Sequence, residues 1–107
     1  MGEIYLEQGN LDESSRALRL SASLNPKQPA VWYQLARCEI RRGEWSTAAD
    51  HLRRSIALDP DQAQARYQLG RTYQQLGNVQ AAELEFQVFQ KLEARQKEQR
   101  KSAPRLY

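Results

Sequence analysis

The chain has 107 residues, 27% of them charged and 40% hydrophobic, and its formal net charge is +3. A chain of this length forms one small domain, and its apolar content is too high for an intrinsically disordered protein. No apolar run approaches the roughly 20 residues of a membrane span, and no basic start followed by an apolar stretch predicts a signal peptide. We therefore expect a soluble, folded protein whose compartment is not predicted.

The first 28 residues predict an incomplete helical hairpin. Gly9 would end a first helix of about eight residues, because glycine favours the helix C-cap. A second helix would carry Leu18 and Leu24 and end before Pro26. So short a first helix predicts that the sequence is a fragment of a longer protein.

Residues 29–62 predict a complete hairpin. Apolar residues from Val31 to Ile40 recur at steps of three and four, as one buried helical face requires. Gly43 then ends this helix. A second apolar run ends at Leu58, because Asp59-Pro60 stops a helix.

Residues 63–96 repeat the same scheme. Tyr33-Gln34-Leu35-Ala36-Arg37 is matched 34 residues later by Tyr67-Gln68-Leu69-Gly70-Arg71. The same offset relates Gly9, Gly43 and Gly77. A fixed offset shared by so many positions indicates one structural unit copied along the chain.

The unit resembles the tetratricopeptide repeat, whose pattern is matched in the second copy by Trp32, Leu35, Ala36, Gly43, Trp45, Ala48, Leu52, Ser55 and Pro60. The third copy matches at Tyr67, Leu69, Gly70, Tyr73, Gly77, Ala82 and Phe86. The first matches at Gly2, Tyr5, Gly9, Leu18, Ser21, Leu24 and Pro26, if the chain starts inside the first helix. The resemblance implies an all-α, right-handed superhelical solenoid of antiparallel helix-turn-helix repeats. The partial repeat is 1–28, and the two complete repeats are 29–62 and 63–96.

The chain departs from the family pattern at several positions. Glu39 replaces an aromatic residue and Arg66 replaces tryptophan. Ala94 replaces the closing proline, so we expect the last helix to continue to about Arg100. Residues 97–107 are expected to form a basic, frayed tail. Because residues 94–107 carry a charge of +4 and the rest −1, the basic excess predicts a solvated tail rather than a nucleic-acid site.

Few residues carry the chemistry that catalysis needs. Cys38 is the single cysteine and is predicted to be an unreactive core thiol. His51 has no cysteine or histidine at metal-binding spacing and is expected to face outward. No phosphate-binding glycine loop or catalytic carboxylate pair is present. We expect no enzyme activity, no cofactor and no metal.

The resemblance also implies a binding groove lined by the first helix of each repeat. The second, fifth, ninth, twelfth and thirteenth positions of a repeat would contact a peptide. The expected groove residues are Tyr33, Arg37, Arg41, Gln64, Tyr67, Arg71, Gln74 and Gln75. Tyrosine and arginine are frequent binding hot spots, and paired guanidinium groups suit a carboxylate. The lysine and asparagine with which such repeats clamp chaperone C-termini are missing from the corresponding positions, where Arg37 and Arg71 stand instead, so we do not expect a receptor for chaperone C-termini.

We therefore predict a protein-interaction module, a scaffold or adaptor whose partner is a protein or peptide with an acidic or carboxylate group. One alternative is a structural, self-associating segment without a peptide ligand. Another is RNA binding by analogy with pentatricopeptide repeats, which the near-neutral body disfavours. No membrane partner is expected.

Packing gives two further expectations. Leu35, Leu52, Leu69 and Phe86 should be largely buried within their repeats. Val88, Phe89 and Leu92 should form an outward apolar stripe on the last helix, which no following repeat covers. This stripe predicts self-association, for example as a homodimer.

Overall fold

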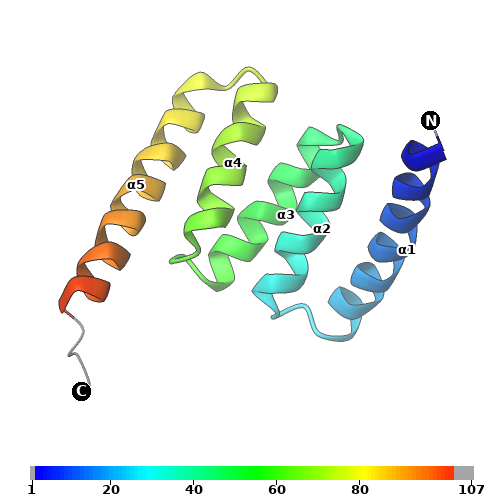
Figure 1. The fold of residues 1–107 in the computed structure, drawn as a ribbon, viewed down its shortest axis with the longest axis horizontal. Coiled ribbons are helices and arrows are strands. Elements are labelled where there is room, and N and C mark those ends of the chain that lie inside the picture. Colours follow the sequence, from blue (N-terminus) through cyan, green and yellow to red (C-terminus); the bar gives the residue numbers. More distant parts are fainter. Residues whose placement is uncertain (1, 103–107) are drawn as a thin grey trace.

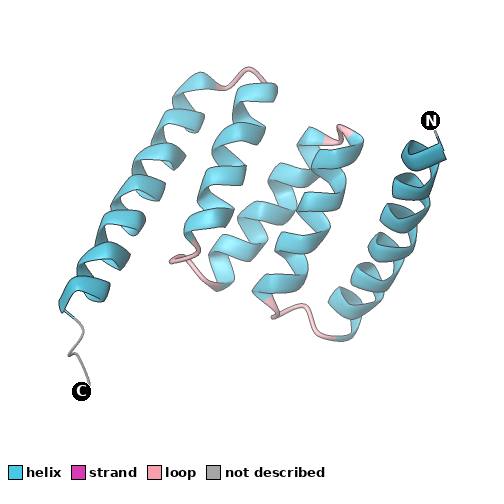
Figure 2. Ribbon diagram, viewed as in Figure 1, coloured by secondary structure: helices cyan, strands magenta, loops and turns pink. Residues whose placement is uncertain are grey.

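The computed structural model describes residues 2–102, with side chains described from Asn10 to Gln99. Every element in this part of the chain is an α-helix: α1 (Gly2–Leu24), α2 (Pro29–Arg42), α3 (Trp45–Leu58), α4 (Ala63–Gln75) and α5 (Val79–Ser102). The helices lie side by side in chain order and alternate in direction, with the termini at opposite ends (Figure 1). Short loops join them (Figure 2). The predicted all-α repeat architecture is confirmed. None of the described helices is long and apolar enough to cross a membrane.

The turns within the second and third repeats lie where glycine was predicted to place them. Gly43 has φ +74° and Gly77 has φ +81°, a left-handed conformation that glycine adopts without steric cost. After α2, the Gly43 and Glu44 amides donate to the carbonyls of Ile40 and Glu39, at 3.0 and 2.8 Å. These bonds satisfy carbonyl groups that the end of a helix leaves free.

The first repeat differs from its prediction. No turn forms at Gly9, because α1 is a single helix from Gly2 to Leu24. A helix of eight residues is only marginally stable on its own, because nucleation is unfavourable and a short helix forms few hydrogen bonds to offset it. A continuous helix keeps the backbone bonds through Gly9 at a cost of about 1 kcal/mol for glycine. Glycine ends a helix here only where a second helix packs against the first.

The last helix continues beyond residue 94 as expected and ends just past Arg100. α5 has 24 residues and reaches Ser102, so residues 97–102 are helical instead of a frayed tail. Its later turns lie beside the start of α4, where Glu93 and Gln96 line a hollow together with Gln62 and Ala63. Residues 103–107 lie outside the described part of the chain.

The core follows the repeat pattern. One cluster joins α2, α3 and α4 and consists of Ala36, Ala48, Ala49, Leu52, Ile56, Ala65 and Leu69. A second joins α1 to α2 through Ala22, Val31 and Leu35, with Leu18 and Trp32 packed against it. Burial of Leu35, Leu52 and Leu69 is confirmed, with at most 2% of each exposed. Phe86 is half-buried rather than buried.

A close contact between Gly70 and Phe86 explains the position of this ring. A Cβ atom on Gly70 would lie 2.6 Å from Cε1 of Phe86. The equivalent pair in the second repeat is Ala36 and Leu52, both fully buried. Alanine therefore faces leucine in one repeat, and glycine faces phenylalanine in the next, so that the paired side chains have complementary sizes.

This fit predicts the effect of a methyl group at position 70. Gly70→Ala should lower the free energy of unfolding by about 1–3 kcal/mol, because overpacking outweighs the helix propensity of alanine, which is worth about 1 kcal/mol. In a Phe86→Leu background, the same change should be neutral or stabilising. Chemical denaturation of the four proteins measures both effects. A stabilising Gly70→Ala in the parent chain would contradict the proposed fit.

Candidate functional site

The predicted groove residues come from α2 and α4. Arg37 and Arg41 of α2 are exposed, as are Gln64, Arg71, Gln74 and Gln75 of α4, whereas Tyr33 and Tyr67 are half-buried. The predicted accessibility therefore holds, but these side chains line several hollows rather than one groove.

Besides a hollow of about 350 Å³ that Arg41 lines with Leu11, Asp12 and Arg42, three hollows receive these residues. The largest, about 450 Å³, lies between α1 and α2 and includes Arg37 and Arg41. A second, about 90 Å³, holds Arg71 and Gln75 beside Ile40. The third, about 300 Å³, is lined by Tyr33 and Gln64 with residues of α5.

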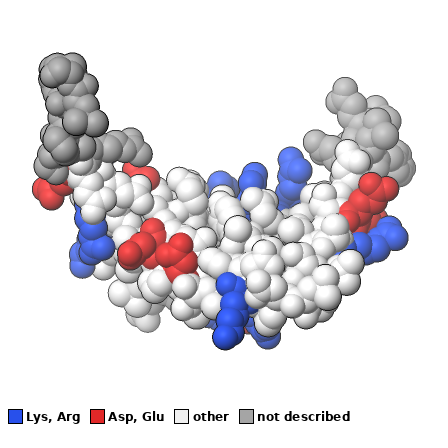
Figure 3. Space-filling view, turned by 90° about the horizontal axis from the view of Figure 1, so that it is seen from below, with Lys and Arg blue, Asp and Glu red and all other residues white. Residues whose placement is uncertain are grey.

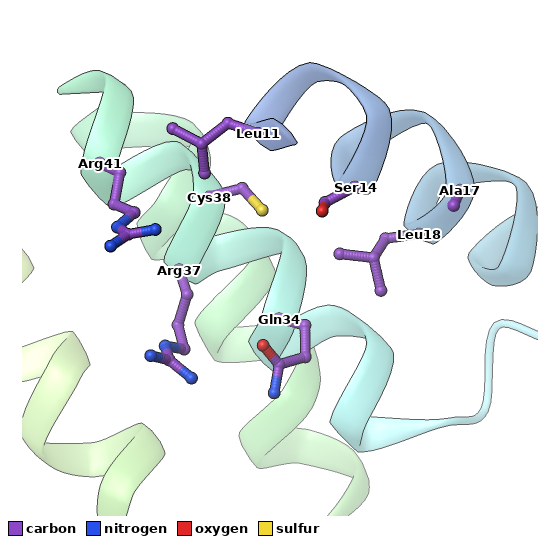
Figure 4. A pocket seen from close by; sticks show the side chains of 8 residues that line it. All are labelled: Leu11, Ser14, Ala17, Leu18, Gln34, Arg37, Cys38 and Arg41. Carbon is purple, nitrogen blue, oxygen red and sulfur yellow. The ribbon is translucent and has the colours of Figure 1, made fainter. Parts of the chain in front are cut away.

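Figure 4 shows the largest hollow at close range. Leu11, Ser14 and Leu18 extend from α1 toward α2, and Cys38 points back toward α1. Arg37 and Arg41 extend from the other side of α2. The floor is thus largely apolar and one rim is basic.

Three groove arginines have no acidic partner among the described side chains: Arg37, Arg41 and Arg71. Other arginines do have one: Arg42 pairs with Asp12, Arg53 with Asp50, Arg66 with Glu85 and Arg95 with Asp61. In Figure 3 the molecule forms an arc, and basic side chains stand in the middle of its hollow face. Unpaired guanidinium groups on an exposed surface are available to bind an anionic group.

Tyr67 contributes less to the surface than expected. Its ring lies 5.1 Å from that of Phe89 and 5.8 Å from that of Phe86, measured between centroids. Tilted aromatic pairs at this separation are attractive. Tyr67 therefore helps to hold α5 against α4.

The predicted outward stripe on α5 is also altered by this packing. Leu92 is only 6% exposed, so it faces inward, which contradicts the expectation. Val88 and Phe89 are half-buried. Leu92 therefore lies on the side of α5 that is packed, not on the side that faces outward. Self-association through Val88 and Phe89 stays a prediction.

A polar pair inside the second repeat was missed by sequence reasoning. His51 Nδ1 lies 2.7 Å from Glu39 Oε1, and both side chains are at most one-fifth exposed. The imidazole also packs on Trp32, with ring centroids 5.3 Å apart. The expectation that His51 faces outward was therefore wrong. A buried carboxylate needs a hydrogen-bond partner, and His51 provides it.

A related pair occupies the third repeat. Arg66 Nη1 donates to Glu85 Oε1 at 2.9 Å. These residues stand 34 positions after Trp32 and His51, whose rings pack together, so both members of that ring contact change together. Glu39 corresponds instead to Tyr73, whose hydroxyl accepts from Arg53.

The remaining polar residues show no sign of a reactive centre. Cys38 is buried and has no disulfide partner. Between Asn10 and Gln99, no three histidine, cysteine, aspartate or glutamate side chains gather as a metal site requires. The Arg53 guanidinium donates to the Tyr73 hydroxyl at 3.0 Å, and this bond raises the pKa of Arg53. An arginine with a raised pKa stays charged, so it tethers α3 to α4 and does not titrate.

The sequence matches models described as tetratricopeptide repeat over residues 29–72, and over 1–28 together with 63–100. A search of curated proteins finds no significant match.

Several solved structures share this fold. A crystal structure of MamA superposes with a TM-score of 0.76 at 25% identity, over 85% of this chain and 53% of that one. The chain therefore spans about half the length of this MamA chain. The first TPR of Spaghetti (RPAP3), bound to the HSP90 peptide SRMEEVD, gives a TM-score of 0.78 at 20% identity, over 87% and 74% of the two chains. The second TPR of the same protein, bound to the same peptide, gives 0.76 at 15% identity, over 85% and 84%.

The Glu39–His51 contact leads to a prediction about stability. His51→Ala leaves the buried Glu39 carboxylate without this partner, which should cost about 1–3 kcal/mol of unfolding free energy. Adding Glu39→Leu to that variant should recover most of the loss, because the buried carboxylate is removed. Denaturant unfolding of the single and double variants measures this. A double variant less stable than His51→Ala would show that the pair is not the cause.

Proposed function

The chain belongs to the tetratricopeptide repeat family, and on that premise we propose that it is a protein-interaction module that binds an acidic peptide segment along α2 and α4. The binding would be passive, because a preformed surface holds a partner without chemical change. No enzymatic step is part of the proposal.

The observation that carries this proposal is the set of unpaired arginines. Arg37 and Arg41 occupy one hollow and Arg71 the next, so the cations are spread along successive repeats. Gln34 lies beside the first two, and Gln68 and Gln75 beside the third. Guanidinium groups bind carboxylates through paired donors, and glutamine amides can bond the backbone of an extended peptide.

The position of Tyr33 also supports peptide binding along α2 and α4. It packs against the core cluster and lines a hollow with Gln64, so its position is fixed while part of the ring stays accessible. A rigid aromatic side chain loses little entropy on binding. Two solved structures with this fold are bound to SRMEEVD, an acidic peptide, which supports the choice of an acidic partner.

A direct test uses a labelled peptide of repeated Glu-Ser-Gly units as an acidic probe in fluorescence anisotropy, because the residues that clamp chaperone C-termini are missing from this chain. The same peptide with glutamine in place of glutamate and an amidated C-terminus is the neutral control. The acidic probe should bind more tightly, and Arg37→Ala/Arg71→Ala should weaken it by at least tenfold. A charge-assisted hydrogen bond contributes about 1.5–3 kcal/mol, and 1.4 kcal/mol corresponds to about tenfold.

The matched control variant is Arg16→Ala/Arg19→Ala, which removes two exposed charges from α1. This control variant should bind the acidic probe with a dissociation constant within about twofold of that of the parent chain, since dissolved salt screens charges that are distant from the binding surface. Equal losses in both double variants would show only a dependence on net charge. Equal binding of both peptides, or tighter binding of a single-stranded RNA with a steep salt dependence, would contradict the proposal.

A further inference from the structure

The hollow between α1 and α2 has a smaller counterpart one repeat later. Each is lined by the sixth, ninth, tenth and thirteenth positions of a repeat. In the larger hollow these are Gln34, Arg37, Cys38 and Arg41, and in the smaller they are Gln68, Arg71, Thr72 and Gln75. The volumes are about 450 and 90 Å³. The side of the helix that carries these four positions is therefore well covered in the third repeat (α4) and open in the second repeat (α2).

The opposite wall accounts for the difference. In the smaller hollow, Ile40 comes from the first helix of the preceding repeat. In the larger hollow, that side is formed by α1 alone. Ser14 is accordingly exposed, although its equivalents Ala48 and Ala82 are 0% and 1% exposed. In the second and third repeats the first helix, α2 or α4, covers the residue equivalent to Ser14. In the first repeat no described helix of the same chain takes this place.

We propose that residues 2–8 of a second copy of this chain occupy this hollow, in a dimer in which the first helices are exchanged. Leu6 stands 34 positions before Ile40, the residue that enters the smaller hollow. Glu3 and Glu7 flank Leu6 at three residues and one residue. The segment thus brings an apolar residue for the floor and two carboxylates for the unpaired Arg37 and Arg41.

Because α1 is continuous, we assign the hollow to residues 2–8 of a second copy and not to the same residues of the same chain. Because α1 does not turn at Gly9, its first residues continue about 12 Å along the helix axis beyond Asn10, away from the hollow of the same chain. Exchange of an identical element is a frequent way to form dimers.

The contacts in the other repeats fix how two first helices would pair. Gly70 faces Phe86, which places Gly2 opposite Leu18 in the first repeat. The Glu39–His51 contact likewise places Tyr5 opposite Ala17. Both pairs are centred on Asn10 or Leu11, so two antiparallel copies of α1 can form each pair twice about a two-fold axis. The interface uses Arg37 and Arg41, which the proposed peptide surface also uses, so dimer formation and peptide binding compete for these two arginines, whereas Arg71 stays available in the dimer.

Sedimentation velocity tests the dimer. The parent chain should be dimeric at micromolar concentration, and Ala17→Glu should raise the dissociation constant at least tenfold by placing a third carboxylate in the interface. Ala17 is exposed in the single chain, so this change should not disturb folding. Leu20→Glu is the matched control, because Leu20 is 60% exposed and does not line the hollow.

Disulfide trapping tests the exchange itself, in a Cys38→Ser background. A Tyr5→Cys chain mixed with an Ala17→Cys chain should give a covalent heterodimer several-fold in excess of the homodimers that either forms alone. Tyr5→Cys mixed with Leu20→Cys is the negative control.

Three results would overturn the proposal. One is a parent chain that stays monomeric at high micromolar concentration. Another is an intrachain disulfide in a monomeric Tyr5→Cys/Ala17→Cys chain, which would show that the segment folds back into its own hollow. The last is a dimer that Ala17→Glu leaves intact, which would place the interface elsewhere, as at Val88 and Phe89.

Discussion

The structure depends on the close approach of the two helices within each repeat. This approach needs a small residue on both helices at the crossing: Ala36 and Ala48 in the second repeat, and Gly70 and Ala82 in the third. Ala36, Ala48 and Ala82 are at most 1% exposed. Larger residues one turn away, Leu52 and Phe86, then fill the remaining space. Once the hairpins close in this way, α2 and α4 must direct their ninth and thirteenth positions away from the core.

The surface that we propose to bind a peptide follows from this constraint. Arg37, Arg41 and Arg71 are exposed because their side of the helix has no packing role, and they lack acidic partners within the described chain. Where the hairpin is not closed, as beside α1, the same constraint leaves Ser14 uncovered and a hollow open. The proposed binding surface and the open first repeat are thus two consequences of the same packing constraint.

Much of the fold could be predicted from the sequence. The bounds of α2, α3 and α4 follow from Gly43, Pro60 and Gly77, whose backbone preferences act locally. The prediction of a turn at Gly9 was wrong because a glycine ends a helix here only where a partner helix packs against it. The prediction for Leu92 was wrong because its burial depends on which side of α5 packs against the preceding helix, which is a tertiary property.

The site was predicted less completely than the fold. The repeat register identified which residues are accessible, but it did not reveal that Tyr67 packs on Phe89, or that His51 is the partner of Glu39. Such pairs depend on side-chain size and burial across two helices. Comparing equivalent positions of the two repeats shows Trp32 with His51 replaced by Arg66 with Glu85, a joint change that marks the Trp32–His51 contact but not the Glu39–His51 pair.

The central claim is that the exposed arginines of α2 and α4 form the binding surface. Nitrogen-detected NMR of arginine side chains, recorded while an acidic peptide is added, tests it most directly. The account predicts saturable shifts of the Nε–Hε signals of Arg37, Arg41 and Arg71, with those of Arg16, Arg19 and Arg54 unchanged. Shifts confined to the arginines of α1 or α3, or spread evenly over all arginines, would contradict it.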